Sequence, residues 1–116
     1  MREPREACGT KERQRQFGVK SLSPAEVAES SAAVLEWLSS IGASKVLVHF
    51  DLDVIDPVEL IVAVGTDPDG MKSDGVIRVV DDIARQFDIV GPTIAEQMPR
   101  VAIKLRNMLA RLPLLR

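Results

Sequence analysis

The most hydrophobic run in the chain, residues 45–50, leads directly into two aspartates, Asp51 and Asp53. A short aliphatic run of this kind predicts a β-strand that is buried on both faces, as strands of parallel sheets are. Side chains two residues apart on an extended strand point the same way, so the two carboxylates share one side. Phe50 and Leu52 take the other side. Because open parallel sheets bind ligands at the carboxyl ends of their strands, we expect the chemistry where this run ends.

A helix and a possible short strand are predicted before this run. The helix is predicted to extend from residue 24 to about residue 40. Ser23, the proline that follows it and Glu26 form a capping box at its start. Gly42 supplies the stop signal. Residues 17–20 are expected to form the short strand that precedes the helix.

A second set of elements is predicted after the run. Turn-forming residues cluster at 65–70, and a helix with one apolar face follows at about 73–86. A strand begins at residue 88 and should end or bend at Pro92, which cannot donate a ladder hydrogen bond. A last helix covers about 99–112. Alternation of strands and helices predicts an α/β fold with a parallel sheet and helices on both of its faces.

Length and composition limit the class of protein. The chain has 116 residues, of which 46% are hydrophobic, and this is enough for one small globular domain. Residues 1–16 are polar and are expected to lie outside the core as an exposed helix or an irregular end. The net charge of -2 favours neither nucleic acid nor an anionic membrane, and no apolar run is long enough to cross a bilayer. A lone cysteine, Cys8, fits a reducing compartment, so the cytoplasm is expected.

The acidic residues form a candidate metal site. Asp51 and Asp53 end one strand, and Glu96 follows a later one, so the three converge if these strands are neighbours. Oxygen ligands suit Mg²⁺ and Mn²⁺, and an imidazole from His49 would shift the preference toward manganese or zinc. Two alternatives remain open: paired aspartates also occur as helix caps or solvated turns, and His49 can be a strand histidine that is hydrogen-bonded near the sheet end.

Three segments resemble one enzyme family. Residues 48–57 read Val-His-Phe-Asp-Leu-Asp-Val-Ile-Asp-Pro and resemble the third metal-binding signature of the ureohydrolases, the arginase and agmatinase family. Residues 65–71 are similar to the loop after that signature, and residues 88–96 to a late strand that ends in a substrate-facing glutamate. The resemblance implies a three-layer α/β/α fold. It also implies hydrolysis of C–N bonds in guanidino substrates, with release of urea, at two Mn²⁺ ions.

The resemblance also implies roles for individual residues. Asp51 would bridge the two metals, Asp53 would bind one of them, and Glu96 would hold the guanidinium group of the substrate. No side chain of this chain is assigned a catalytic role beyond these. Asp56 is expected to make a structural turn bond before Pro57.

The upstream ligand segments of the family are missing from this sequence. Neither the Gly-Gly-Asp-His segment nor the Asp-Ala-His-x-Asp segment is present, and His49 is the one histidine. Residues 17–116 therefore resemble the carboxyl-terminal part of an arginase-like domain, truncated relative to the family. The alternative to an active hydrolase is an inactive remnant or an accessory subunit with an incomplete metal site. A second copy or a complementing chain could complete the sheet.

A second enzyme class shares the Asp-x-Asp pattern. In phosphatases of the haloacid dehalogenase type, the first aspartate of such a pair is the nucleophile and magnesium assists. That motif normally has threonine or valine where Ile55 stands, and the acidic pair Asp81 and Asp82 lies within a predicted helix. The sequence therefore favours the ureohydrolase interpretation.

Overall fold

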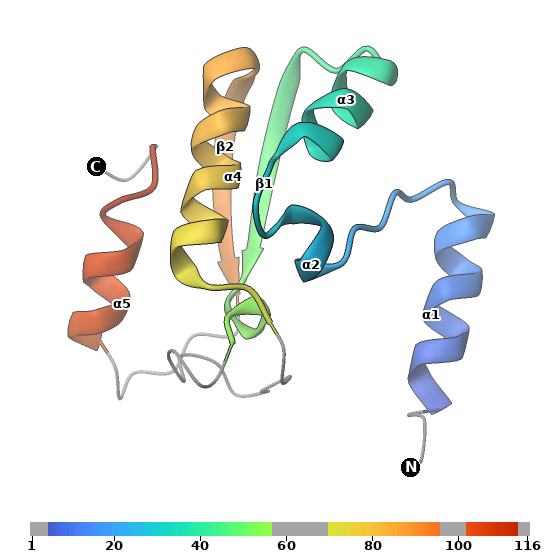
Figure 1. The fold of residues 1–116 in the computed structure, drawn as a ribbon, viewed down its shortest axis with the longest axis horizontal. Helices are drawn as coiled ribbons and strands as arrows, with labels where there is room; N and C mark the ends of the chain where they lie inside the picture. Colours follow the sequence, from blue (N-terminus) through green and yellow to red (C-terminus); the bar gives the residue numbers. More distant parts are fainter. Residues whose placement is uncertain (1–4, 57–69, 96–101, 114–116) are drawn as a thin grey trace.

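The computed structural model of the protein describes residues 5–56, 70–95 and 102–113 (Figure 1). The described elements are α1 (Arg5–Gln16), α2 (Pro24–Val27), α3 (Ala32–Ser40), β1 (Lys45–Asp51), the 3-10 turn η1 (Leu52–Val54), α4 (Ser73–Gln86), β2 (Asp88–Ala95) and α5 (Ala102–Leu109). None of the helices in these ranges is long and apolar enough to cross a membrane.

The two strands form a parallel sheet, which confirms the predicted α/β class. The register runs from Lys45 opposite Asp88 to Asp51 opposite Ala95. The register shifts once: Val46 pairs with Ile89, but the next pair joins Leu47 to Gly91. Val90, which lies between Ile89 and Gly91, therefore has no register partner on β1. This β-bulge lies close to Pro92, where the sequence predicts that the strand ends or bends; β2 does not end there but continues to Ala95. A proline is tolerated because β2 is an edge strand in the described sheet.

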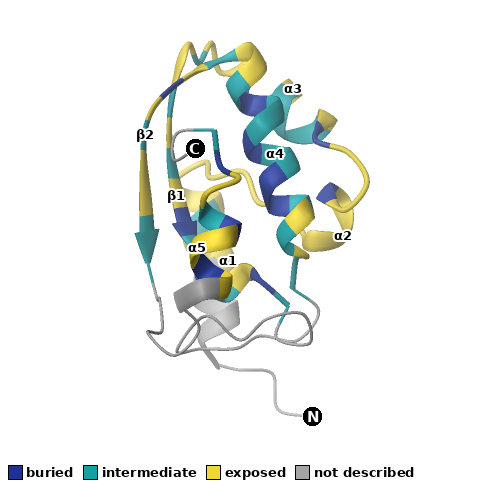
Figure 2. Ribbon diagram, turned by 90° about the vertical axis from the view of Figure 1, so that its left-hand side faces the viewer, coloured by how far each residue is buried: buried dark blue, intermediate teal, exposed yellow. Residues whose placement is uncertain are grey.

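The helices cover one face of the sheet (Figure 2). Helix α4 turns one apolar stripe inward, because its buried residues recur three and four positions apart. The core consists of side chains more than nine-tenths buried: Leu38, Phe50, Leu52, Ile55, Val76, Ile77, Val80, Ile83, Ile89, Leu105, Met108 and Leu112.

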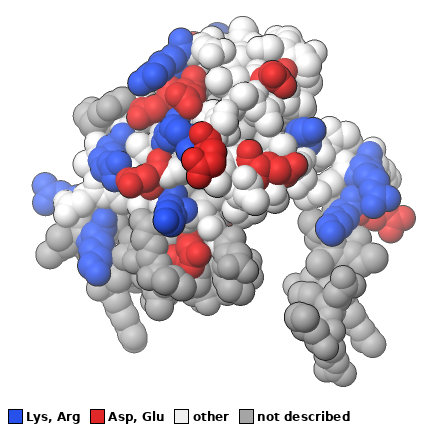
Figure 3. Space-filling view, viewed as in Figure 1, with Lys and Arg blue, Asp and Glu red and all other residues white. Residues whose placement is uncertain are grey.

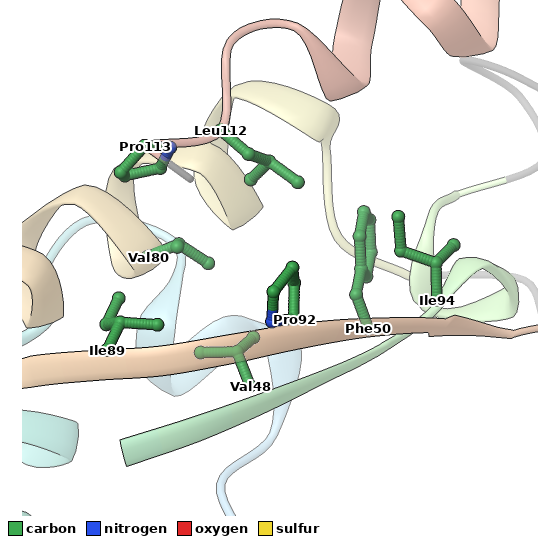
Figure 4. Close-up of a pocket in the computed structure, with 8 residues that line it drawn as sticks. All are labelled: Val48, Phe50, Val80, Ile89, Pro92, Ile94, Leu112 and Pro113. Carbon is green, nitrogen blue, oxygen red and sulfur yellow. The ribbon is translucent and has the colours of Figure 1, made fainter. Parts of the chain in front are cut away.

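A small cavity lies between α4 and the sheet (Figure 4). Its volume is about 20 Å³, and Val80 and Leu112 face Val48 and Phe50 across it. The lining is aliphatic and aromatic, so the cavity offers no hydrogen bonds to a water molecule. This part of the covered face is therefore apolar.

The opposite face of the sheet is exposed in the described part of the chain. Leu47 is 65% exposed and Val90 is 57% exposed, and His49 and Thr93 are also exposed. The expectation that β1 is buried on both faces is therefore wrong for this structure. Its aliphatic sequence was correctly associated with a parallel sheet, but the described helices pack against only one side.

The helix predicted for residues 24–40 is broken into α2 and α3. The predicted capping box is present: the Glu26 N–H donates to Ser23 Oγ (3.3 Å), and the Ser23 N–H donates to Glu26 Oε2 (2.6 Å). Beside the break, Ser30 Oγ accepts a hydrogen bond from the Ala32 N–H (3.1 Å), and Ser31 is the N-cap of α3. Gly42, with a φ of 71°, ends α3 as predicted.

The strand predicted for residues 17–20 is absent, because this segment closes α1 instead. Gly18 has a φ of 65°, and the Val19 N–H donates to the Gln14 carbonyl (2.8 Å), which is a helix-ending arrangement. In Figure 1, α1 stands apart from the sheet and its covering helices. Helix α4 matches its prediction, and α5 lies within the range predicted for the last helix.

Candidate functional site

Asp51 and Asp53 lie on a tight turn at the carboxyl end of β1. Asp51 is the last residue of the strand, and Asp53 belongs to η1. Asp51 Oδ1 accepts a hydrogen bond from the Asp53 N–H at 3.2 Å, so Asp51 caps this turn. The extended geometry assumed from the sequence therefore ends at Asp51, and the turn rather than strand alternation relates the two acids.

Buried side chains hold this acidic turn against the core. Leu52, between the two aspartates, is 0% exposed, and Phe50 and Ile55 are also buried. Asp51 and Asp53 are half-buried. Phe50 and Leu52 thus anchor the backbone in the core, as predicted, while Asp51 and Asp53 stay at the surface.

Asp51 also lines an apolar cavity on the covered side of β1. The cavity has a volume of about 320 Å³ and includes His49, Val54 and Met71 among its lining residues, with the apolar side chains of α4. Asp51 therefore lies at the boundary between the core and the rim of the sheet.

Met71, which follows residues 57–69 in the sequence, makes a second contact that closes the acidic turn. The Met71 N–H donates to the Val54 carbonyl (2.7 Å), and the Asp56 N–H donates to the Met71 carbonyl (2.8 Å). These bonds form an isolated parallel bridge between Ile55 and Met71. The sequence showed a turn cluster here but gave no signal that its end returns to the aspartates.

Strand β2 ends at the same edge of the sheet as β1. Ala95, the last residue of β2, lies opposite Asp51. Glu96 follows Ala95 in the sequence and lies outside the described residues. Its role in substrate binding stays a prediction, as do the metal-binding roles of Asp51 and Asp53 and the structural turn bond of Asp56, the residue before Pro57.

His49 makes the hydrogen bond expected of a strand histidine. Its Nδ1 lies 2.6 Å from Thr93 Oγ1, and Thr93 is its register partner on β2. The bond lies on the exposed face of the sheet. Thr93 was not identified from the sequence, because a cross-strand pair depends on the register, which the bulge shifts.

The donor set fits part of a manganese site. Carboxylate oxygens suit Mn²⁺, which commonly takes six ligands. Within the described ranges no three His, Cys, Asp or Glu side chains come together as a metal-binding group. Asp51 and Asp53 can therefore contribute ligands, but the described residues do not form a complete site.

Charges of both signs lie side by side on the face that α4 presents (Figure 3). Asp74 forms an ion pair with Arg111 at 2.8 Å. Asp82 and Arg85 form a weaker pair at 4.0 Å. This face therefore presents acids and bases side by side rather than a field of one sign.

Comparisons with known proteins identify the family of this chain. A sequence model described as the arginase family matches residues 1–112. The chain is also similar to an X-ray crystal structure of a hypothetical agmatinase from Burkholderia thailandensis, with a TM-score of 0.59 and 25% identity. That similarity covers 71% of this chain and 26% of the agmatinase chain, so the chain spans about a quarter of its length. A search of curated proteins found no match. Since the family model matches nearly the whole chain, the protein belongs to the arginase family.

Proposed function

We propose that this chain supplies part of a manganese-dependent site that hydrolyses a C–N bond of a guanidino substrate and releases urea. The observation that supports this most is the acidic turn, where Asp51 and Asp53 follow a parallel strand and are held by buried neighbours. The family match gives these acids a reaction context. The cytoplasmic setting expected from the sequence belongs to the same proposal.

In this proposal the residues of the chain bind and orient. Asp51 and Asp53 would hold Mn²⁺ through their carboxylate oxygens. When bound, the metal supplies the Lewis acidity that makes water nucleophilic near neutral pH. Glu96 would hold the cationic guanidinium through charge-assisted hydrogen bonds. Water adds to the guanidinium carbon, the C–N bond to the substrate chain breaks, and the leaving amine takes up a proton.

The remaining metal ligands would come from outside the described residues. Two carboxylates leave most of a manganese coordination sphere to other donors. A second copy of the chain or a complementing chain is one source of such donors and would also cover the exposed sheet. The alternative is an accessory subunit or an inactive remnant that keeps the fold without turnover.

The first prediction concerns metal binding by the two aspartates. Asp51→Asn and Asp53→Asn keep the shape of the side chains but remove their charge, so each should weaken Mn²⁺ binding in a calorimetric titration. Asp88→Asn is the matched control, because Asp88 is exposed at the opposite end of β2. Circular dichroism should show the same helix content in all variants.

Activity separates the enzyme from the alternative. Urea release is measured from arginine, agmatine and guanidinobutyrate with added Mn²⁺. Turnover that is lost in Asp51→Asn and kept in Asp88→Asn supports the hydrolase. A folded chain that binds Mn²⁺ without turnover is an inactive remnant or an accessory subunit. Equal Mn²⁺ binding by the wild type and both aspartate variants contradicts the site assignment.

A further inference from the structure

Gly70 packs against the backbone of residues 54–56, and there is no room for a side chain at position 70. A Cβ atom placed on Gly70 would lie 2.5 Å from the Val54 carbonyl oxygen, 2.9 Å from the Asp56 nitrogen and 3.1 Å from the Ile55 carbonyl carbon. All three are backbone atoms, which cannot rotate away as the end of a flexible side chain can. The contact therefore requires a glycine for reasons of space.

Backbone conformation does not explain this glycine. Among the described glycines, those with positive φ are Gly18 and Gly42. An alanine at position 70 therefore meets the steric contact without the additional strain of a left-handed backbone. The effect of Gly70→Ala can be attributed to the displaced neighbours.

Two of the atoms that Gly70 touches, Val54 O and Asp56 N, belong to hydrogen bonds that close the chain beside the acidic turn. Val54 O accepts from the Met71 N–H, and the Asp56 N–H donates to Met71 O. One step back along the chain, the Ile55 N–H donates to the Leu52 carbonyl at 3.3 Å and closes the 3-10 turn. The same turn carries Asp53, whose N–H donates to Asp51.

We infer that Gly70 is a positioning residue for the carboxylates of Asp51 and Asp53. Its missing side chain lets residues 70–71 close against residues 54–56, and this closure sets the geometry of the acidic turn. With alanine, Val54 O must retreat by about 0.9 Å to reach an ordinary contact of 3.4 Å. Site residues need to be held within roughly 0.5 Å of their working geometry, so this displacement is large enough to matter. The consequence for metal binding rests on the proposed function.

The test compares Gly70→Ala with Gly75→Ala. Gly75 is a matched control, because a Cβ there would lie 3.6 Å from Met71 Cε, an ordinary contact with a flexible side chain. Two quantities are measured: amide hydrogen exchange at Asp53 and Asp56 by NMR, and Mn²⁺ affinity by calorimetry. Exchange reports the turn without any metal, which a change in activity alone could not do.

Gly70→Ala should accelerate exchange at Asp53 and Asp56, while amides of β1 and α4 keep their protection. Mn²⁺ affinity should fall roughly 10- to 100-fold, as is common when residues that orient metal ligands are changed. Gly75→Ala should leave both quantities at the wild-type value.

Three other outcomes are decisive. Unchanged exchange at Asp53 and Asp56 overturns the positioning role, and so does loss of protection throughout β1 and α4, which would mean that Gly70 supports the whole fold. If exchange accelerates locally but the wild type binds no Mn²⁺, the positioning role stands and the proposed metal site is wrong.

Discussion

At the residue scale, Ser23 and Glu26 show how a local pattern fixes a local structure. The two residues exchange hydrogen bonds at the start of α2. The backbone N–H of Ser23, followed by its side chain, lowers the pKa of the Glu26 carboxyl below its ordinary value of 4.5. The ionised carboxylate is the better acceptor, so the bond favours the charged form.

We predict that the Glu26 carboxyl titrates at a lower pH in the folded protein than in the unfolded chain. A lowered pKa means that the capping contribution is complete above the unfolded pKa and is lost as the pH falls through the folded pKa. Side-chain carbon NMR of Glu26 measures both values, with the chain in concentrated urea as the reference. A folded pKa equal to or above the unfolded one would contradict the prediction.

The residues that could be predicted from the sequence are those whose partners lie close by. The capping box and the helix stop at Gly42 depend on neighbours within a few positions. The buried position of Phe50 follows from the strand pattern; Leu52 is buried as well, although it belongs to the 3-10 turn after the strand. Gly70 and Thr93 could not be identified, because their contacts join segments that are distant in the sequence. Glu96 lies outside the described residues and stays a prediction.

At the element scale, Arg78 joins α4 to the end of α2. Its guanidinium donates to the carbonyl oxygens of Val27 and Ala28, the latter at 2.6 Å. These carbonyls lie where the predicted long helix is broken. Apolar periodicity predicted one helix for residues 24–40, because it cannot reveal the local hydrogen bond from Ala32 to Ser30 or the distant arginine that binds the carbonyls at the break.

We predict that Arg78→Met destabilises the fold by about 1–2 kcal/mol, since it removes two charge-assisted hydrogen bonds. Arg85→Met is the matched control on the same helix. Arg85 is mostly exposed and its ion pair with Asp82 is long, so its loss should cost less than about 0.5 kcal/mol. Urea unfolding measures both changes. Equal effects of the two substitutions would show that the link from Arg78 to α2 contributes no stability.

At the scale of the whole molecule, helices cover one face of the described sheet, and no described helix covers the other, bare face. The sequence predicted the parallel order of β1 and β2 correctly. It could not show which face stays open, because the apolar residues of β1 suit burial on either side. A two-stranded sheet with an exposed apolar face and free edges is prone to associate with other chains.

We predict that the double variant Leu47→Lys/Val90→Lys self-associates less than the wild type. Both side chains lie on the bare face, and charge there opposes contact with another apolar surface. Ile41→Lys is the control, because Ile41 is as exposed as Val90, at 57%, but lies beyond the end of α3. Light scattering over a concentration series measures the mass. The same concentration dependence for all three proteins would exclude the bare face as the contact.

The bulge in β2 has a consequence for insertions and deletions. Ile89, Pro92 and Ile94 all line the side of the sheet that the helices cover, although Ile89 and Pro92 are three residues apart in the sequence. The extra residue at the bulge restores the alternation that this spacing would otherwise break. A relative could lack one residue at 90–91 and keep every side chain on its present face. The same deletion after Pro92 would turn Ile94 outward, so the strand tolerates a change of length at one point and nowhere beyond it.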